Sequence, residues 1–174
     1  MSALPTFLDV PRFCAACGHE LSPKDPKLGG WPCPKCGIPS FVDPKVAACV
    51  VPWWEGKIVL VRRAIEPRIG YFSSPGGYCE RGEPPHHAAA REAFEETGLV
   101  VDPGDLLGVF AHRGSPVIVI YYDCTIRGGG PPRPVSECTE IGLFAPEEIP
   151  WDQLAFSSVH EALCAAIAHR EMNK

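Results

Sequence analysis

Two short cysteine pairs of the form Cys-x2-Cys stand near the start of the chain, with fifteen residues between them. The pairs are Cys14 with Cys17 and Cys33 with Cys36. Each pair can turn two thiolates toward one ion, and four thiolates at this spacing are typical of a tetrahedral zinc site. We therefore predict that residues 1–40 form a small ribbon around a structural Zn²⁺, which supplies most of the segment's folding free energy.

Two redox-active pairs are the alternative to a zinc site. A redox dithiol normally adjoins an alternating strand and helix pattern, whereas this segment is rich in proline and lysine. The chain has nine cysteines in all, an odd number that fits a reducing compartment better than a disulfide framework. Met1 to Phe13 hold neither the basic stretch nor the apolar run of an export signal. We expect a cytoplasmic protein.

Composition narrows the possible partners. The chain has 174 residues, of which 45% are hydrophobic, and its formal charge is −5. This is enough apolar material for one core and too little positive charge for a general affinity for nucleic acid. Residues 1–45 carry five basic and four acidic side chains, so the predicted ribbon also lacks the excess of positive charge that nucleic-acid binding requires. The longest apolar run, residues 46–54, is too short to span a bilayer.

Beyond Pro44 the pattern changes to alternating β-formers. Residues 46–54 and 57–64 predict a hairpin with its turn at Glu55 and Gly56. Further strands are predicted over residues 106–113, 115–126 and 140–145. Residues 128–134 are rich in glycine and proline, which predicts a flexible loop without strand structure.

Two helices are predicted in the same part of the chain. The first covers residues 84–97, with a proline in its first turn and Gly98 as its stop signal. The second begins near Ser157, with Ser158 and Glu161 as a capping box. Its predicted buried stripe consists of Val159, Leu163, Ala166 and Ile167. The order of strands, helix, strands, helix predicts an α/β fold in which helices sandwich a mixed sheet.

Three glutamates on the first predicted helix, Glu92, Glu95 and Glu96, follow the spacing i, i+3 and i+4. Their carboxylates project from one face and repel one another, which destabilises an isolated helix. A hard divalent cation such as Mg²⁺ would offset that repulsion, because it prefers carboxylate and phosphate oxygens. From these three residues alone, a solvated acidic helix face is the simpler interpretation.

The surrounding residues favour the metal site, because the stretch GYCERGEPPHHAAAREAFEETGL, residues 77–99, resembles the Nudix box. The matching positions are Gly77, Glu83, Arg91, Glu92, Glu95, Glu96 and Gly98, with apolar Ala93 and Leu99. The resemblance implies a Nudix α/β/α sandwich around a mixed sheet over residues 41–174. It also implies an enzyme that hydrolyses a nucleoside diphosphate linked to another moiety.

The resemblance further implies roles for individual residues. Glu92 and Glu96 correspond to primary ligands of a catalytic Mg²⁺ or Mn²⁺, Glu95 shares the metals or positions water, and the Gly76 carbonyl is a backbone ligand. Arg91 is expected to pair with Glu83 and hold the loop against the helix. The implied chemistry is hydrolytic phosphoryl transfer without a covalent nucleophile.

Some family members use a further glutamate as general base, and Glu140 in SECTEIGLF falls where that segment is expected. Glu137 is its rival. The sequence also offers candidates for contact with the substrate, chosen for a charge that suits phosphate or a ring that suits a base. These candidates are Arg62, Arg63, Arg68 and Phe72.

The substrate class follows from the wider resemblance. A tetracysteine ribbon before a Nudix domain is similar to NADH diphosphatases, but their SQPWPFP-like stretch after the box is absent here. The fuller likeness is to a zinc-ribbon Nudix subgroup that acts on ADP-ribose and FAD, giving AMP and the partner phosphate. Related enzymes often form homodimers. The alternatives are an NADH diphosphatase, a hydrolase of capped or damaged nucleotides, and a regulator that binds a nucleotide without cleaving it.

Overall fold

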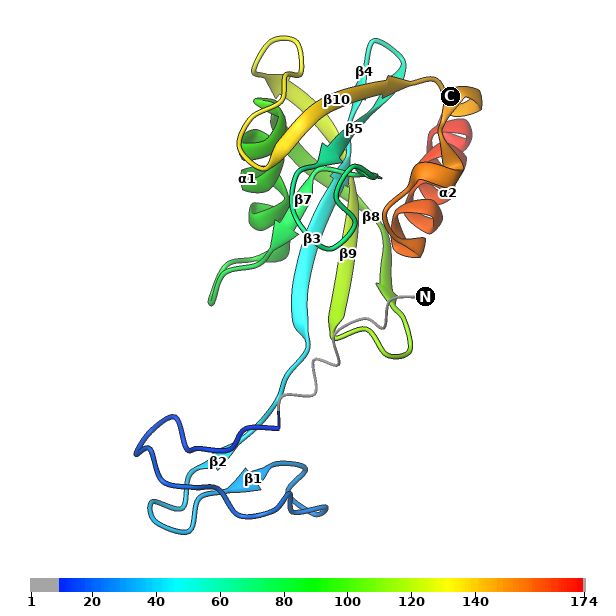
Figure 1. The fold of residues 1–174 in the computed structure, drawn as a ribbon. Coiled ribbons are helices and arrows are strands. Elements are labelled where there is room, and N and C mark those ends of the chain that lie inside the picture. Colours follow the sequence, from blue (N-terminus) through cyan, green and yellow to red (C-terminus); the bar gives the residue numbers. More distant parts are fainter. Residues whose placement is uncertain (1–9, 174) are drawn as a thin grey trace. The chain divides into compact units, whose positions relative to one another are not determined.

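The computed structural model describes residues 10–173, which form two compact units that divide between Pro44 and Lys45 (Figure 1). Residues 1–9 of the predicted ribbon and Lys174 lie outside the described residues. No helix within residues 10–173 combines the length and the apolar character that a membrane crossing requires.

The first unit has little regular structure. Its two short strands, β1 (Trp31–Pro32) and β2 (Pro39–Ser40), pair antiparallel. Phe13 and Phe41 are about half exposed, whereas Cys14 and Cys33 are buried. Within residues 10–44, therefore, cysteine side chains occupy the interior that aliphatic side chains fill in a larger domain.

Two sheets build the second unit. Its strands are β3 (Lys45–Val51), β4 (Trp53–Trp54), β5 (Lys57–Arg63), β6 (Phe72–Ser73), β7 (Gly76–Tyr78), β8 (Val100–Ala111), β9 (Val117–Gly128) and β10 (Cys138–Phe144). The mixed sheet has the order β7, β3, β9, β8, and its only parallel pair among the described strands is β3 with β9. The antiparallel sheet has the order β10, β5, β4, with β6 also paired to β5.

Helices α1 (Pro85–Thr97) and α2 (Ser157–Met172) lie on opposite sides of the mixed sheet (Figure 1). Strand β3 is buried on both faces: Ala48 and Val50 belong to the core cluster on the α1 side, and Cys49 and Val51 to the cluster on the α2 side. A strand covered on both faces is a continuous apolar run in sequence. Two short 3₁₀ turns, Pro146–Glu148 and Trp151–Gln153, precede α2. The predicted α/β/α sandwich is confirmed.

The two helix predictions have different outcomes at their starts. Helix α1 begins at a proline and ends where Gly98 adopts a left-handed conformation and donates its N–H to the Phe94 carbonyl, 2.8 Å away. The capping box predicted for α2 is wrong, because the Ser158 side chain is buried beside the Tyr121 hydroxyl and caps no helix N–H. Glu161 lies instead 3.5 Å from His112. The predicted stripe of α2 does face the core.

Two strand predictions are corrected. Strand β3 does not form a hairpin with β5, because it pairs with β7 and β9 in the other sheet. Only β4 forms the hairpin across Glu55 and Gly56. The chain changes sheets at Pro52, which lacks an N–H for strand pairing and uses its carbonyl to accept the Val59 N–H.

Strand β8 begins at Val100, six residues before the predicted start at residue 106. Register shifts between Pro103 and Leu106 let the strand continue past a proline that cannot donate to a regular ladder.

Candidate active site

Two of the three predicted ligand glutamates on α1 turn toward the sheet. The backbone N–H of Gly76 donates to Glu96 Oε2 at 2.9 Å. The Glu92 carboxylate packs on Gly77 so closely that a Cβ at residue 77 would lie 2.4 Å from its Cδ. The side chain of Glu95 is half exposed at the rim. The box therefore folds into a close contact between the Gly76–Tyr78 strand and two carboxylates.

The Arg91 guanidinium forms hydrogen bonds with several acidic side chains of the box. Its Nε and Nη2 donate to the two oxygens of Glu83 at 2.9 and 3.0 Å, which confirms the predicted pair. Its Nη1 also donates to Glu92 at 2.8 Å and to Glu95 at 3.2 Å. The Arg91 guanidinium holds the pKa of Glu83 at about 2, well below the ordinary glutamate value. Arg91 thus links the loop after β7 to the ligand face of α1.

Replacing Glu83 by Gln is expected to lower the melting temperature at neutral pH, because Arg91 loses its two-oxygen partner. The pKa of Glu83 is depressed in the folded protein, so its stabilising effect is present above the ordinary value of 4.5 and is lost as the pH falls toward about 2. Thermal unfolding at a series of pH values should show the parent and the variant converging in acid. Glu80→Gln, at an exposed neighbour, is the control. A gap between parent and Glu83→Gln that stays constant down to acid pH would contradict the assignment.

The environment of Glu92 and Glu96 suits a divalent cation. Burial raises the pKa of Glu96 to about 7, although the Gly76 N–H works against that rise, and burial also raises the pKa of Glu92. A nearby positive ion stabilises the charged form of a carboxylate, and this stabilisation is larger for a partly buried carboxylate than for a fully exposed one. Carboxylate oxygens beside backbone carbonyls are the ligand type that hard cations prefer. The residues present therefore fit the divalent cation that the Nudix resemblance implies.

The two candidate bases lie in different surroundings. Glu140 Oε2 accepts from Arg62 Nε at 2.6 Å and so sits in an ion pair on β10 and β5. Glu137, besides burial, contributes to the raised pKa of both Glu92 and Glu96 through its negative charge. Glu137 is exposed and lies two residues after Val135, whose N–H donates to the Glu96 carbonyl at 3.0 Å, whereas the Glu140 carboxylate is held by Arg62.

The residues predicted to contact the substrate also lie in different surroundings. Phe72 has only 3% of its surface exposed, with its ring edge-on to Phe144, which makes it part of the core. Arg62 lies over that ring and also donates to the Gly70 carbonyl at 2.6 Å. Arg68 lies over the Tyr71 ring. These two arginines and Phe72 are engaged with other parts of the protein.

Arg63 is engaged as well, because its Nε donates to the Pro67 carbonyl at 2.9 Å. It differs from the other two in that its positive charge opposes the burial that raises the pKa of Glu96. Its guanidinium also lies 5.1 Å from the ring centre of Phe156, which is 36% exposed. Sequence analysis missed Phe156, because it lies directly before α2, far in sequence from the box. The one sequence feature that could have indicated Phe156 is its place as an aromatic residue directly before the second predicted helix.

The four patterned cysteines converge in the first unit. Their sulfur atoms all lie within 4.8 Å of one another, including Cys14 to Cys36 and Cys17 to Cys33 at 3.6 Å each. Backbone N–H groups of Cys36 and Lys35 lower the pKa of Cys33 to about 6. Four sulfurs in so small a space can hold a metal ion.

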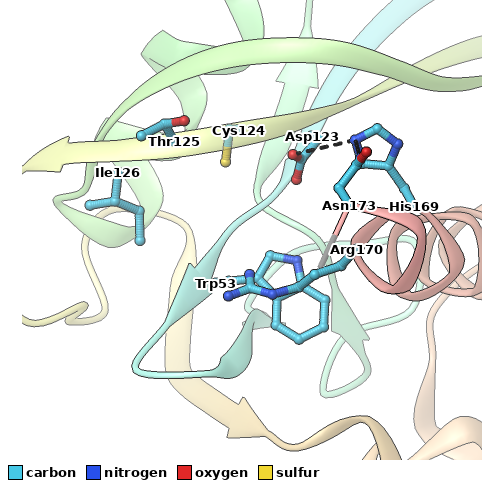
Figure 2. A pocket seen from close by; sticks show the side chains of 8 residues that line it. All are labelled: Trp53, Asp123, Cys124, Thr125, Ile126, His169, Arg170 and Asn173. Atoms are coloured by element: carbon cyan, nitrogen blue, oxygen red, sulfur yellow. Dashed lines mark hydrogen bonds and ion pairs between the residues drawn. The ribbon is translucent and has the colours of Figure 1, made fainter.

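A cavity of about 580 Å³ lies elsewhere, between β4, β9 and the end of α2 (Figure 2). Arg170 lies over the Trp53 ring at 4.4 Å, and Asp123 is 3.9 Å from His169. None of the predicted site residues lines it. The C-terminal end of α2, where the helix dipole is negative, and the Asp123 carboxylate both disfavour an anionic substrate in this cavity.

Comparison with known proteins places the chain among its relatives. Residues 43–163 match the NUDIX domain family. A "MutT-like protein" of Streptomyces ambofaciens is 33% identical over 95 residues, which is 55% of this chain and 59% of that protein. An "ADP-ribose pyrophosphatase" of Methanocaldococcus jannaschii is 32% identical over 128 residues, which is 71% of this chain and 72% of that protein.

A "NAD-capped RNA hydrolase NudC" of Haemophilus influenzae is 30% identical over 97 residues. The match covers 55% of this chain but only 36% of that relative. Among solved structures, a NUDIX hydrolase from Nitrosomonas europaea superposes with a TM-score of 0.84 at 30% identity, covering 94% of both chains. The matched domain, the arrangement of the box and this superposition together show that the chain belongs to the NUDIX family.

Proposed function

We propose that this protein is a Mg²⁺-dependent hydrolase of a nucleoside diphosphate linked to another moiety. Its substrates are ADP-ribose, FAD or both, and its products are AMP and the partner phosphate. The observation that carries the proposal is the pair of half-buried carboxylates, Glu92 and Glu96, held against the backbone of Gly76 and Gly77. No role as a solvated acidic surface requires this close fit.

Each residue around the pair has a distinct task. Glu92, Glu96 and the Gly76 carbonyl would hold the divalent cation, either Mg²⁺ or Mn²⁺, and the half-exposed Glu95 would share the metal or position water. When bound, such a cation would neutralise charge on the diphosphate and lower the pKa of the attacking water. Arg91, fixed by Glu83, orients Glu92.

The general base in this proposal is Glu137, with Glu140 as the alternative. A base must lie within reach of water at the reacting phosphorus. Glu137 is close enough to Glu92 and Glu96 for its charge to contribute, after burial, to their raised pKa. Glu140 would first have to leave its short ion pair with Arg62.

The substrate's phosphate and base have candidate partners in Arg63 and Phe156. The Arg63 guanidinium lies 5.1 Å from the centre of the partly exposed Phe156 ring, and its charge acts on the Glu96 carboxylate, so a diphosphate on Arg63 would bring an attached aromatic base toward that ring. A guanidinium suits phosphate oxygens, and an aromatic ring suits a purine or flavin. The similarity to an ADP-ribose pyrophosphatase supports this class.

A second candidate substrate is an NAD-type dinucleotide, either free or as an RNA cap. The similarity to a NAD-capped RNA hydrolase favours it, and so does the cysteine cluster of a ribbon. The stretch LVVDPGDLLGVFAHRGSPV after the box, without the motif of NADH diphosphatases, weighs against it.

A substrate panel with Mg²⁺ and with Mn²⁺ tests the choice. We expect kcat/KM for ADP-ribose and FAD to exceed that for NADH, NAD-capped RNA and nucleoside triphosphates, with AMP among the products resolved by chromatography. A clear preference for NADH or capped RNA would select the second candidate. Tight binding of ADP-ribose without release of AMP would identify a regulator instead of an enzyme.

A further inference from the structure

The 129–137 segment, which joins β9 to β10, is attached to the end of α1. The Arg133 N–H donates to the Thr97 carbonyl and the Val135 N–H to the Glu96 carbonyl, each at 3.0 Å. The last carbonyls of a helix have no partner within the helix. The segment supplies those partners, so the glycine and proline stretch that was predicted to be flexible is attached to α1 through Arg133.

Gly129 is where the segment touches the helix end most closely. A Cβ at this position would lie 2.1 Å from the Gly98 carbonyl oxygen and 2.9 Å from Leu99 Cα. Both contacts are with backbone, which cannot swing aside as a side chain can. Both Gly129, with φ of 100°, and its neighbour Gly130, with φ of 73°, have positive φ angles that L-residues rarely adopt. At Gly130, however, nothing lies within 4 Å of the Cβ position. A side chain would therefore obstruct the contact at Gly129 and not at Gly130.

The far end of the segment carries the candidate base. The Glu137 carbonyl accepts the Ala64 N–H at 3.0 Å, just after β5 ends. In the other direction, the Glu96 carbonyl holds the segment while the Glu96 carboxylate faces Gly76. One residue of α1 thus takes part in both the ligand face and the attachment of the segment that bears Glu137.

We propose that Gly129 is a positioning residue, whose close contact with Gly98 seats the 129–137 segment and so holds Glu137 beside Glu92 and Glu96. This inference rests on the proposed function, in which Glu137 is the base. The Nudix box, which ends at Leu99, does not contain Gly129, and the contact joins segments that are distant in sequence.

The test compares Gly129→Ala with Gly130→Ala, which share the cost of alanine in a left-handed backbone but differ in the clash. Amide hydrogen exchange should show lost protection at Arg133 and Val135 in Gly129→Ala only. On ADP-ribose, Glu137→Gln is expected to lower kcat roughly 10²-fold, as for loss of a general base. Gly129→Ala should lower kcat in the same direction, with KM nearly unchanged, and Gly130→Ala should stay near the parent.

A double variant separates positioning from general damage. In the Glu137→Gln background, adding Gly129→Ala should cause no further loss of kcat, because the base is already absent. Equal effects of Gly129→Ala with and without Glu137, or equal effects of the two alanine variants, would overturn the proposal. If Gly129→Ala does not fold, Val135→Pro removes one attaching N–H without the clash and should give the same pattern more weakly.

Binding of Mn²⁺ gives a readout that does not depend on activity. Because Glu137 adds negative charge beside the ligand carboxylates, Glu137→Gln and Gly129→Ala should both weaken Mn²⁺ binding measured by calorimetry, and Gly130→Ala should not. A parent that binds Mn²⁺ but cleaves no nucleotide would refute the proposed function alone. Unchanged Mn²⁺ affinity in Gly129→Ala, where Glu137→Gln weakens it, would refute the positioning role alone.

Discussion

Replacing Glu96 by Gln is expected to lower kcat on the best nucleotide substrate by roughly 10²- to 10⁴-fold, the order of magnitude for losing a preorganised charge partner in the transition state. Glutamine keeps the shape of the side chain and an oxygen for the Gly76 N–H, but it removes the charge that holds the cation. The dependence of the rate on Mg²⁺ concentration should also weaken. Steady-state kinetics over a range of Mg²⁺ concentrations measure both effects.

The fold should survive this substitution. Removing one carboxylate from the cluster on α1 relieves repulsion, so the melting temperature of the metal-free protein should stay level or rise slightly. Glu171→Gln, at an exposed glutamate on α2, is the matched control and should leave kcat and the Mg²⁺ response unchanged. If Glu96→Gln keeps the parental kcat and Mg²⁺ response, the glutamates are only a solvated helix face.

Replacing Cys33 by Ser should remove bound zinc and unfold the first unit. The parent is expected to hold about one zinc per chain, as four thiolates bind one tetrahedral ion. Zinc binding to small domains is worth about 10–16 kcal/mol of folding free energy. Within residues 10–44 little else is buried, and Cys33 itself is 2% exposed. Elemental analysis and amide exchange of residues 14–40 measure zinc content and folding of the unit.

The second unit should respond differently to the same substitution. Residues 45–173 have their own two core clusters, so hydrolysis should persist after the first unit has lost its metal. Cys164→Ser, at an exposed cysteine on α2, is the control for general thiol loss. A parent without zinc, together with an unaltered melting temperature in Cys33→Ser, would refute the zinc assignment.

Structural features that depend on residues close together in the chain could be predicted from the sequence. Helix α1 was predicted almost to its ends, because its proline start and the glycine at residue 98 act within one turn of backbone. The convergence of the four cysteines followed from the spacing of recurrent motifs, whereas the Arg91 and Glu83 pair was implied by the resemblance to the Nudix box. In such motifs a fixed number of residues corresponds to a fixed distance, since helix and turn geometry vary little.

Features that join distant segments required the folded structure. The sequence of β3 shows that the strand is buried, but not that it pairs with β9 instead of β5, because an apolar run is compatible with either neighbour. Glu137 and Glu140 are equally plausible bases in sequence. Their separation comes from the attachment of the 129–137 segment to α1 and from the Arg62 pair.

The amino-acid pattern alone was therefore enough to predict the family and the cysteine cluster, and the role of Glu92 and Glu96 as metal ligands stays a prediction. Docking of the 129–137 segment on α1, the approach of Phe156 to Arg63, and the burial of Ser158 emerged from the tertiary structure. These contacts depend on strand register and on which side chains meet across the core. A shift of one residue in a strand turns every side chain to the other face, and no local signal specifies that choice.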